Sequence, residues 1–307
     1  METKNSWKAW IYLAPALILL AVFTFYPMVN TIRISFLEGY KSTLAYRPGG
    51  YRFDLGFENY IMVVLKNKSF FEGLYNTMVL AFITVPLSTI LALLIAVALN
   101  SIKFLQKFIQ TIFFLPYVTN SIAIGMVFAM IFNVIQTGNI IEDMGLFNRL
   151  LDVFGIAPID WISMGASKAT KMFVSSVYII WNALPFKIMI LLGALQSVNK
   201  QYYEAAKVDG TTKFRIFTKI TVPLISPMLA YVIITGFIGA FKEYSSLVGI
   251  FGENLSAYGM NTMVGFIYDS LELVWEGDAA AGAVVLFLII LVFTGIQGII
   301  NKKKVHY

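Results

Sequence analysis

The chain has 307 residues, of which 58% are hydrophobic and 13% charged, and its mean hydropathy is +0.75. This composition leaves too little polar surface to cover a water-soluble globule, so it indicates a membrane protein. The formal net charge of +6 fits basic loops that face an anionic leaflet. Because the basic residues are spread over short loops between apolar runs, nucleic-acid binding is not expected. The absence of cysteine excludes disulfides and thiolate chemistry.

Six apolar segments are long enough to cross a bilayer, whose hydrocarbon core of about 30 Å takes about 20 helical residues. They lie near 10–31, 73–99, 108–133, 172–195, 222–248 and 279–300. The first segment follows Lys4 and Lys8, as a signal peptide would. Its uncharged stretch from Trp10 to Val29 is longer than a signal-peptide core, and no small-residue cleavage site follows it, so it predicts a retained anchor. We therefore expect an all-α, multi-pass membrane protein with six transmembrane helices.

Proline and basic residues refine this topology. Kinks are expected at the prolines within spans, which are Pro15, Pro86, Pro116 and Pro185. Lys and Arg are denser in the short loops on the side of the amino terminus, which predicts that both termini are cytoplasmic. The expected organisation is an anchor helix with an outer loop at 1–72, a transmembrane core at 73–301 and a basic cytoplasmic tail at 302–307.

Several kinds of catalytic site are absent from the sequence. No phosphate-cradling loop of the form GxxxxGK[ST] occurs, so the chain is not expected to hydrolyse ATP itself. The only histidine is His306 in the tail, which excludes a Ser-His-Asp triad and histidine-based zinc sites. We therefore expect a non-enzymatic protein without catalytic residues, metal sites or cofactors.

The most polar cytoplasmic segment lies between the fourth and fifth spans, at about 198–223. Its pattern predicts two short helices that are interrupted at Asp209 and Gly210. Gly210 can take the left-handed conformation that ends the first helix. Thr211 or Thr212 can then cap the second helix through its hydroxyl group.

The first of these helices has a surface suited to contact with a partner. Ala205 and Ala206 leave one surface nearly bare, so a partner groove can approach the backbone closely, and Glu204 projects a charge from the same turn. The helical pattern alone fits an amphipathic helix lying on the lipid surface equally well.

This segment resembles the EAA signature of binding-protein-dependent ABC importer permeases. Its matching parts are Glu204-Ala205-Ala206, then Gly210, and then Ile220-Thr221-Val222-Pro223, in which Val222 replaces the usual Leu. Residue types, spacing and cytoplasmic position all agree with the signature. The resemblance implies the type I ABC importer permease fold, in the bacterial plasma (inner) membrane.

Further segments resemble the carbohydrate branch of this family, whose members are similar to the first maltose-type permease subunit. They are Gly56-Phe57-Glu58-Asn59-Tyr60, Asn76-Thr77, Phe113-Phe114-Leu115-Pro116, Leu195-Gln196, Phe241-Lys242, Asn261-Thr262-Met263 and Ile267-Tyr268. The large extra outer domain of the maltose subunit is missing. The resemblance therefore implies a six-span permease subunit for another sugar or oligosaccharide.

The resemblance also implies partners and roles. An extracellular binding protein would deliver the solute, a second homologous permease would complete the path, and a separate ATP-binding cassette subunit would dock on the EAA segment, within surrounding membrane lipid. The residues implied in coupling to the ATPase are Glu204, Ala205, Ala206, Asp209, Gly210, Ile220 and Pro223.

Polar residues within the fourth and fifth spans are candidates for the translocation path. Charged side chains are costly inside a membrane and usually face protein or water, which singles out Lys187, Lys242 and Glu243. A sugar also offers hydroxyl groups and an apolar face to suitable side chains, and the further candidates are Trp181, Asn182, Tyr244 and Ser245. Snorkelling of the charged groups and ordinary interhelical packing explain the same residues equally well.

Other functions remain as alternatives. A permease for glycerol-3-phosphate or its diesters would look similar, and its substrate would favour a basic lining. An ion-coupled secondary transporter would carry its own ion site, usually in paired repeats, and the sequence shows no such duplication. A structural or signalling membrane protein would leave the EAA segment unexplained.

Overall fold

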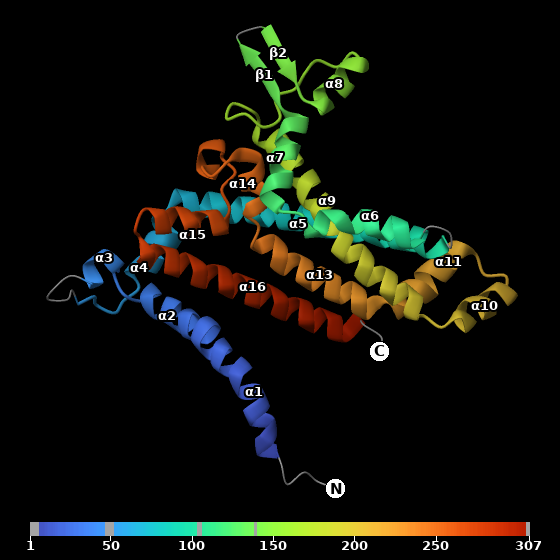
Figure 1. The fold of residues 1–307 in the computed structure, drawn as a ribbon, viewed down its shortest axis with the longest axis horizontal. Coiled ribbons are helices and arrows are strands. Elements are labelled where there is room, and N and C mark those ends of the chain that lie inside the picture. The colour runs from blue at the N-terminus through green and yellow to red at the C-terminus, as the bar shows by residue number, and fades with distance from the viewer. Residues whose placement is uncertain (1–5, 47–51, 103–105, 138–139, 305–307) are drawn as a thin grey trace. The chain divides into compact units, whose positions relative to one another are not determined.

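The computed structural model describes residues 6–46, 52–102, 106–137 and 140–304 (Figure 1). The elements up to the only described hairpin are α1 (Ser6–Leu20), a π-helical turn (Ala21–Phe25), α2 (Tyr26–Ser35), α3 (Ser42–Ala45), α4 (Glu58–Ile61), a second π turn (Met62–Lys66), α5 (Lys68–Ser101), α6 (Gln106–Val118) and α7 (Ser121–Phe132). The hairpin consists of β1 (Val134–Thr137) and β2 (Ile140–Met144).

The second half of the chain is helical throughout its described elements. They are α8 (Leu146–Val153), α9 (Lys168–Ser197), α10 (Lys200–Val208), α11 (Lys213–Ile216), a π turn (Phe217–Thr221), α12 (Val222–Leu224), α13 (Ser226–Phe241), α14 (Ser245–Phe251), a 3₁₀ turn (Leu255–Tyr258), α15 (Met263–Glu272) and α16 (Glu276–Lys304). The predicted tail at 302–307 continues α16 as far as Lys304, and its remainder, with His306, lies outside the described residues.

The six predicted spans appear as four continuous helices and two bent pairs within the described residues. The continuous ones are Trp10–Ser35, Lys68–Ser101, Lys168–Ser197 and Glu276–Asn301. The bent pairs are Gln110–Val118 with Ser121–Phe132, at 103°, and Lys213–Leu224 with Ser226–Phe241, at 69°. The described residues therefore hold four candidate spans by length and apolar composition, and up to six if each bent pair is one crossing.

The third and fifth spans differ from the single helices that we predicted. The third breaks before Asn120, whose side-chain oxygen accepts hydrogen bonds from the backbone N–H groups of Ile122 and Ala123 and so begins α7 as a new helix. The fifth ends at Phe241, and α14 starts separately at Ser245. The four predicted kink prolines lie inside helices, and Pro116 stands two residues before the first break. Pro223 and Pro227 flank the second break.

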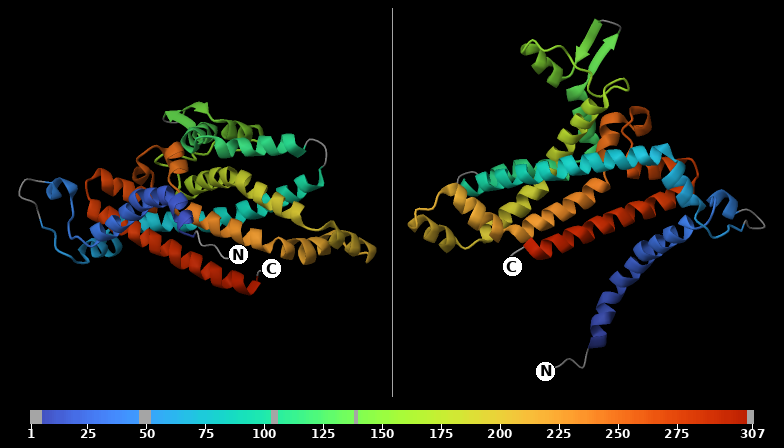
Figure 2. Two further views of the ribbon diagram at one scale, coloured as in Figure 1. Left: turned by 60° about the horizontal axis from the view of Figure 1, so that its bottom comes forward. Right: turned by 180° about the vertical axis from the view of Figure 1, so that it is seen from behind.

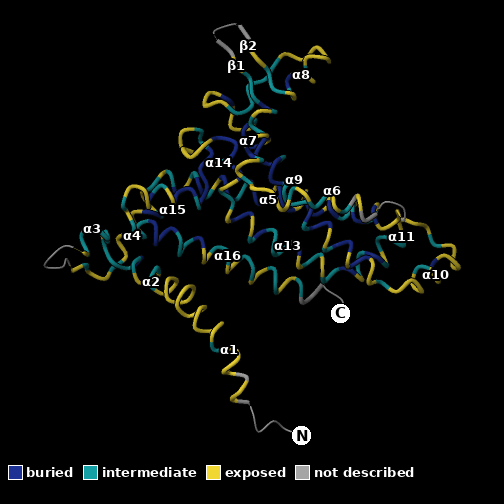
Figure 3. Tube along the Cα trace, viewed as in Figure 1, coloured by how far each residue is buried: buried dark blue, intermediate teal, exposed yellow. Residues whose placement is uncertain are grey.

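The chain divides into two compact units. The first comprises Met1–Phe71 and Phe266–Leu288. The buried amide of Asn59 organises it by donating to the carbonyl oxygens of Ser35, at 3.1 Å, and Leu37, at 2.8 Å. This side chain therefore holds the chain that leaves α2 against α4. The most apolar stretch of the first span is exposed along its length (Figure 3), as expected of a helix whose surface faces lipid.

The second unit comprises Glu72–Gly265 and Ile289–Tyr307, and α9 is central to it. Helix α9 packs against α6, α7, α13 and α14, and Figure 2 shows it lying alongside α13. One apolar cluster lies around the fully buried Tyr178 and a second around the fully buried Leu191, so both are built on the same helix. Helix α9 is buried over much of its length, and Phe173 and Met189 are exposed on its remaining surface.

Two segments that carry the family resemblance meet in this unit. The buried Asn76 of α5 donates to the carbonyl oxygens of Gly259, at 3.1 Å, and Asn261, at 2.8 Å. The hydroxyl of Thr77 accepts a hydrogen bond from the backbone N–H of Met263 at 3.0 Å. The Asn76-Thr77 and Asn261-Thr262-Met263 motifs therefore form one buried polar junction that fixes the start of α15 against α5.

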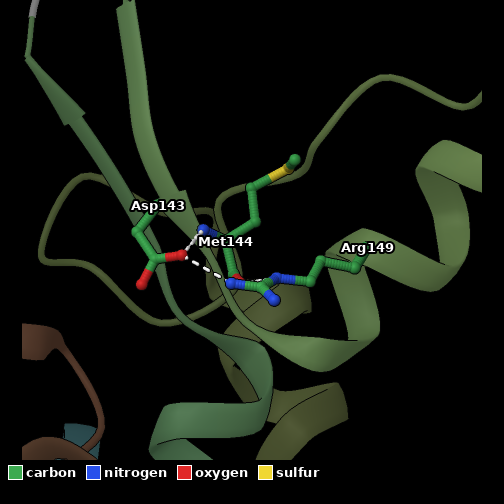
Figure 4. A network of polar contacts seen from close by, with 3 residues as sticks. All are labelled: Asp143, Met144 and Arg149. Carbon is green, nitrogen blue, oxygen red and sulfur yellow. Dashed lines mark hydrogen bonds and ion pairs between the residues drawn. The ribbon is translucent and has the colours of Figure 1, made fainter.

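The β-hairpin and α8 were not predicted. Strands β1 and β2 pair antiparallel, with a bulge between Ile135 and Gln136. Arg149 of α8 donates to the Asp143 carboxylate at 2.9 Å and to the Met144 carbonyl at 2.8 Å (Figure 4). The Arg149 guanidinium, and then the Met144 N–H, hold the pKa of Asp143 below its usual value. These exposed contacts join the hairpin to α8 and leave the fold class all-α apart from this small ribbon.

Candidate functional site

The predicted two-helix segment forms as expected, in the stretch from Asn199 to Leu224, which we call the α10–α12 segment. Gly210 has φ +67°, the left-handed conformation. The N–H of Gly210 bonds to the carbonyl of Lys207 at 3.0 Å, and that of Thr211 bonds to Ala206 at 3.0 Å. This pair of bonds is the Schellman arrangement, which satisfies the last carbonyls of α10.

Polar side chains begin both helices of the segment. Asn199 accepts a hydrogen bond from the N–H of Gln201 at 3.0 Å at the start of α10. The Thr212 hydroxyl accepts from the N–H of Arg215 at 3.4 Å at the start of α11, so Thr212, of the two predicted threonines, is the cap. These caps fix where each helix starts, and the turn at Gly210 fixes the angle between them.

The surface of the α10–α12 segment divides the predicted coupling residues into two groups. Glu204, Ala205, Asp209 and Gly210 are exposed, whereas Ala206 is buried and Ile220 and Pro223 are half-buried. Large apolar side chains are also exposed on the same segment, namely Tyr202 at 55%, Val208 at 88% and Phe214 at 77%. Such exposure of apolar groups beside charged ones is typical of a surface that a partner or lipid covers.

A cavity of about 360 Å³ lies in the second unit, and we call it the Lys187 cavity. It is bounded by α5, α6, α9 and α13. Of the predicted path residues, it brings together Asn182, Lys187 and Glu243. Its remaining polar and aromatic lining residues are Thr84, Ser88, Tyr117, Phe186 and Thr235. The mixture of hydroxyl, amide and aromatic groups provides both hydrogen bonds and a stacking surface.

Lys187 is only 4% exposed, and its ammonium group has three partners on α5. It donates to the Ser88 hydroxyl at 2.7 Å, to the Thr89 hydroxyl at 3.0 Å and to the Val85 carbonyl at 3.3 Å. Ser88 and Thr89 donate their own hydrogens to backbone carbonyls of α5, so their lone pairs are free to accept. Because an ammonium has three donors, Lys187 is fully satisfied by its own fold and joins α9 to α5.

Glu243 has a local structural role at the edge of this cavity. One of its carboxylate oxygens accepts hydrogen bonds from the backbone N–H groups of Tyr244 and Ser246, both at 3.1 Å. A carboxylate is favoured at the exposed N–H groups of a helix start, so Glu243 stabilises the beginning of α14. The break between α13 and α14 therefore places this acidic group at the cavity.

The other predicted path residues do not line the Lys187 cavity. The Trp181 ring packs against Phe128 at 5.5 Å between centroids, and Tyr244 packs on the apolar cluster around Tyr178. Lys242 and Ser245 are exposed on either side of the helix break. Ordinary packing and exposure therefore account for the positions of these four side chains.

Sequence reasoning missed the hydroxyl-bearing residues of α5. Thr84 and Ser88 lie four residues apart in the span and therefore on one helix face, and Thr89 follows directly. The spacing of Thr84 and Ser88 is the signal that could indicate them. The close approach of α13 to Lys187 could not be predicted from the sequence. It depends on Gly236, where an added Cβ would lie 3.2 Å from the Lys187 ammonium.

Comparison with known proteins identifies the family. The family model described as binding-protein-dependent transport system inner membrane component matches residues 85–306. The arabinooligosaccharides transport system permease protein of Bacillus subtilis is 30% identical over 286 residues, covering 92% of this chain and 85% of that protein. The trehalose/maltose transport system permease protein of Thermococcus litoralis is 26% identical over 295 residues, covering 96% and 93%.

A solved structure has the same fold. It is a chain of the bacterial alginate ABC transporter in complex with alginate pentasaccharide-bound periplasmic protein, with a TM-score of 0.77 and 20% identity over 98% of this chain and 96% of that chain. Together with the four to six candidate spans, these matches establish a multi-pass permease of the inner membrane with the type I ABC importer permease fold. The chain belongs to the family of binding-protein-dependent transport system inner membrane components.

Proposed function

We propose that this chain is one of two permease subunits of an ATP-driven importer, and that it forms half of a translocation path for a sugar or oligosaccharide. Relatives named as arabinooligosaccharide, trehalose/maltose and lactose transport permeases support the cargo class. The alginate transporter structure, solved with a periplasmic protein, supports delivery by an extracellular binding protein. The observation that carries the proposal is the ordered α10–α12 segment with its exposed acidic and apolar surface.

The α10–α12 segment is the proposed docking element for a separate ATP-binding cassette subunit. Glu204 and Ala205 are exposed on α10, and Val208 and Phe214 offer apolar area that gains free energy when a groove covers it. The capped helices and the Gly210 turn hold these groups in one arrangement. A rigid element of this kind can transmit movement of the ATPase to α9 and α13, which flank it in the chain.

Reversal of the charge at Glu204 tests this docking. Glu204→Lys is expected to weaken ATPase binding about thirtyfold or more and so to lower the amount that co-purifies with the chain, since reversing an interfacial charge costs about 2 kcal/mol or more. If α10 instead lies on an anionic lipid surface, the added lysine strengthens that contact and leaves co-purification unchanged. Glu253→Lys, at another exposed acidic residue, is the matched control and should retain the ATPase.

The Lys187 cavity is the proposed place where the sugar passes this subunit. Asn182 can bond to sugar hydroxyl groups, and Tyr117 and Phe186, whose rings lie stacked at 5.8 Å, offer an aromatic surface. The satisfied Lys187 argues against glycerol-3-phosphate as cargo, because a phosphate would have to displace the three partners of the ammonium group. Family membership argues against an ion-coupled secondary transporter.

Substitutions in and beside the Lys187 cavity distinguish residues that contact the sugar from residues that only stabilise the fold. Asn182→Ala is expected to reduce sugar uptake about five- to tenfold, as the loss of about 1 kcal/mol of hydrogen bonding predicts, without changing the melting temperature. Tyr244→Ala should instead lower the melting temperature, because its ring packs on the apolar cluster around Tyr178. Ser245→Ala, exposed beside the cavity, should change neither quantity. Wild-type uptake by Asn182→Ala would remove the cavity from the path.

A further inference from the structure

A second cavity, of about 410 Å³, lies in the first unit, and we call it the Lys41 cavity. Its walls come from the chain that follows α2, from the start of α5 and from the start of α16. Three basic side chains line it, namely Lys41, Lys66 and Lys68. The aromatic rings of Tyr40 and Trp275 and the carboxylate of Asp278 complete the part of the lining that carries recognition chemistry.

The walls of this cavity are fixed by hydrogen bonds. The backbone N–H of Gly277 donates to the Tyr40 carbonyl at 3.2 Å. The Ser42 backbone N–H donates to the Glu276 carboxylate at 3.3 Å, and the Ser42 hydroxyl bonds to the same oxygen. Asn59, which lines the cavity, also accepts from the N–H of Gly39 at 3.3 Å. The loop after α2 is thus tied to the first turn of α16, and the cavity is a built feature of this unit.

Three candidate spans end or begin at the walls of the cavity, as expected of a site at the depth of lipid headgroups. Trp10–Ser35 ends just before its loop, and Lys68–Ser101 and Glu276–Asn301 begin at its walls. The ends of these three candidate spans nearest the cavity are therefore expected on the same side of the membrane. Trp275 is 43% exposed at this level, as interfacial tryptophans commonly are.

Charge and apolar surface at the cavity favour one kind of ligand. Three lysines line it with one carboxylate, Asp278. The nearby Glu276 carboxylate is held by Ser42, and Glu58 acts on Asp278 from beside the cavity, so the lysines are the groups open to a phosphate. Met62 lies in the lining, and Leu65 and Phe71 are exposed nearby in sequence at 71% and 49%, which gives apolar area for acyl chains. A soluble saccharide has no acyl chains and no negative charge, so it would use neither the apolar side of the cavity nor its lysines.

We propose that the Lys41 cavity binds the phosphate of an anionic glycerophospholipid, with its lysines around the headgroup and its apolar side toward the acyl chains. The site is separate from the Lys187 cavity and does not depend on which solute the importer carries. Bound lipid would fasten the loop after α2 to the starts of α5 and α16, so it would stabilise the first unit within the bilayer.

Native mass spectrometry of the purified chain in detergent tests this site with phosphatidylglycerol as the anionic probe and phosphatidylcholine as the zwitterionic one. The wild-type protein should retain phosphatidylglycerol several-fold better. Lys66→Gln should reduce that retention about fivefold, since a basic residue near anionic lipid contributes about 1 kcal/mol, and the triple Lys41→Gln, Lys66→Gln, Lys68→Gln variant should reduce it further. Asp278→Asn should increase it.

Controls separate this site from general attraction to lipid. Lys168→Gln, which removes a lysine that lies over the Tyr75 ring, should leave the preference unchanged. If the triple variant fails to fold, lipid retention by the single variant Lys66→Gln still tests the proposal, because Lys66 is exposed. Equal retention of both lipids, or unchanged retention in Lys66→Gln, would overturn the proposal. Displacement by millimolar inorganic phosphate would show a free-phosphate site, and displacement by maltose a sugar site, and either result would also overturn it.

Discussion

Gly210→Pro is expected to reduce ATP-driven uptake by more than about tenfold while the chain remains inserted in the membrane. Gly210 has φ +67°, whereas proline fixes φ near −65°. Proline also lacks the N–H that bonds to the Lys207 carbonyl. The turn between α10 and α11 would therefore open, and the two helices would no longer present one surface to the ATPase.

A series at Gly210 separates conformation from side-chain size. No atom lies within 4 Å of an added Cβ, so steric clash cannot explain an effect at this position. Asn tolerates the left-handed conformation and should retain most uptake, whereas Ala should lose part of it through about 1–2 kcal/mol of backbone strain. The measurement is uptake and ATP hydrolysis by the assembled importer in vesicles. Wild-type uptake by Gly210→Pro would rule out the coupling role of this turn.

Gly249→Ala is expected to destabilise the second unit by about 2–3 kcal/mol, as overpacking of a tight contact does. An added Cβ at Gly249 would lie 2.6 Å from the Ile122 carbonyl oxygen and 2.8 Å from the Gly125 Cα. Both are backbone atoms, which cannot move aside as a flexible side chain can. Helices α7 and α14 would have to separate, since small residues are what allow such close approach in membrane proteins.

Thermal unfolding of the detergent-solubilised protein measures this effect. The melting temperature of Gly249→Ala should fall by about 5–10 °C, and Gly125→Ala should behave alike because it meets Gly249 from the other side. Gly193→Ala in α9 is the matched control. No atom lies within 4 Å of its added Cβ, and it should be neutral or stabilising by about 0.5–1 kcal/mol. An unchanged melting temperature in Gly249→Ala would contradict the close crossing.

The sequence predicts the spans and the α10–α12 turn well because both depend on local chemistry. A run of apolar residues is enough to indicate a crossing, and a glycine with a threonine two residues later is enough to indicate a helix end and a new start. The structure agrees with these features at Gly210 and Thr212. The orientation of the termini stays a prediction, because it rests on loop charge alone.

The features that the sequence does not predict depend on contacts between distant segments. The break before Asn120 requires its side chain to cap a helix within an apolar run, where uninterrupted helix is the simpler reading. Lys187 reads as an unpaired charge in a span, yet its partners Ser88 and Thr89 lie about a hundred residues earlier. The proposed lipid cavity likewise combines lysines near α5 with the start of α16.

The most direct test of the proposed function is oligosaccharide uptake by vesicles that contain the chain with its ATPase, second permease and binding protein. Uptake should require ATP on the side of the α10–α12 segment, and it should stop without ATP even when a proton or sodium gradient is present. Uptake by the chain alone, driven by such a gradient without any ATPase, would contradict the assignment of an ATP-driven permease subunit.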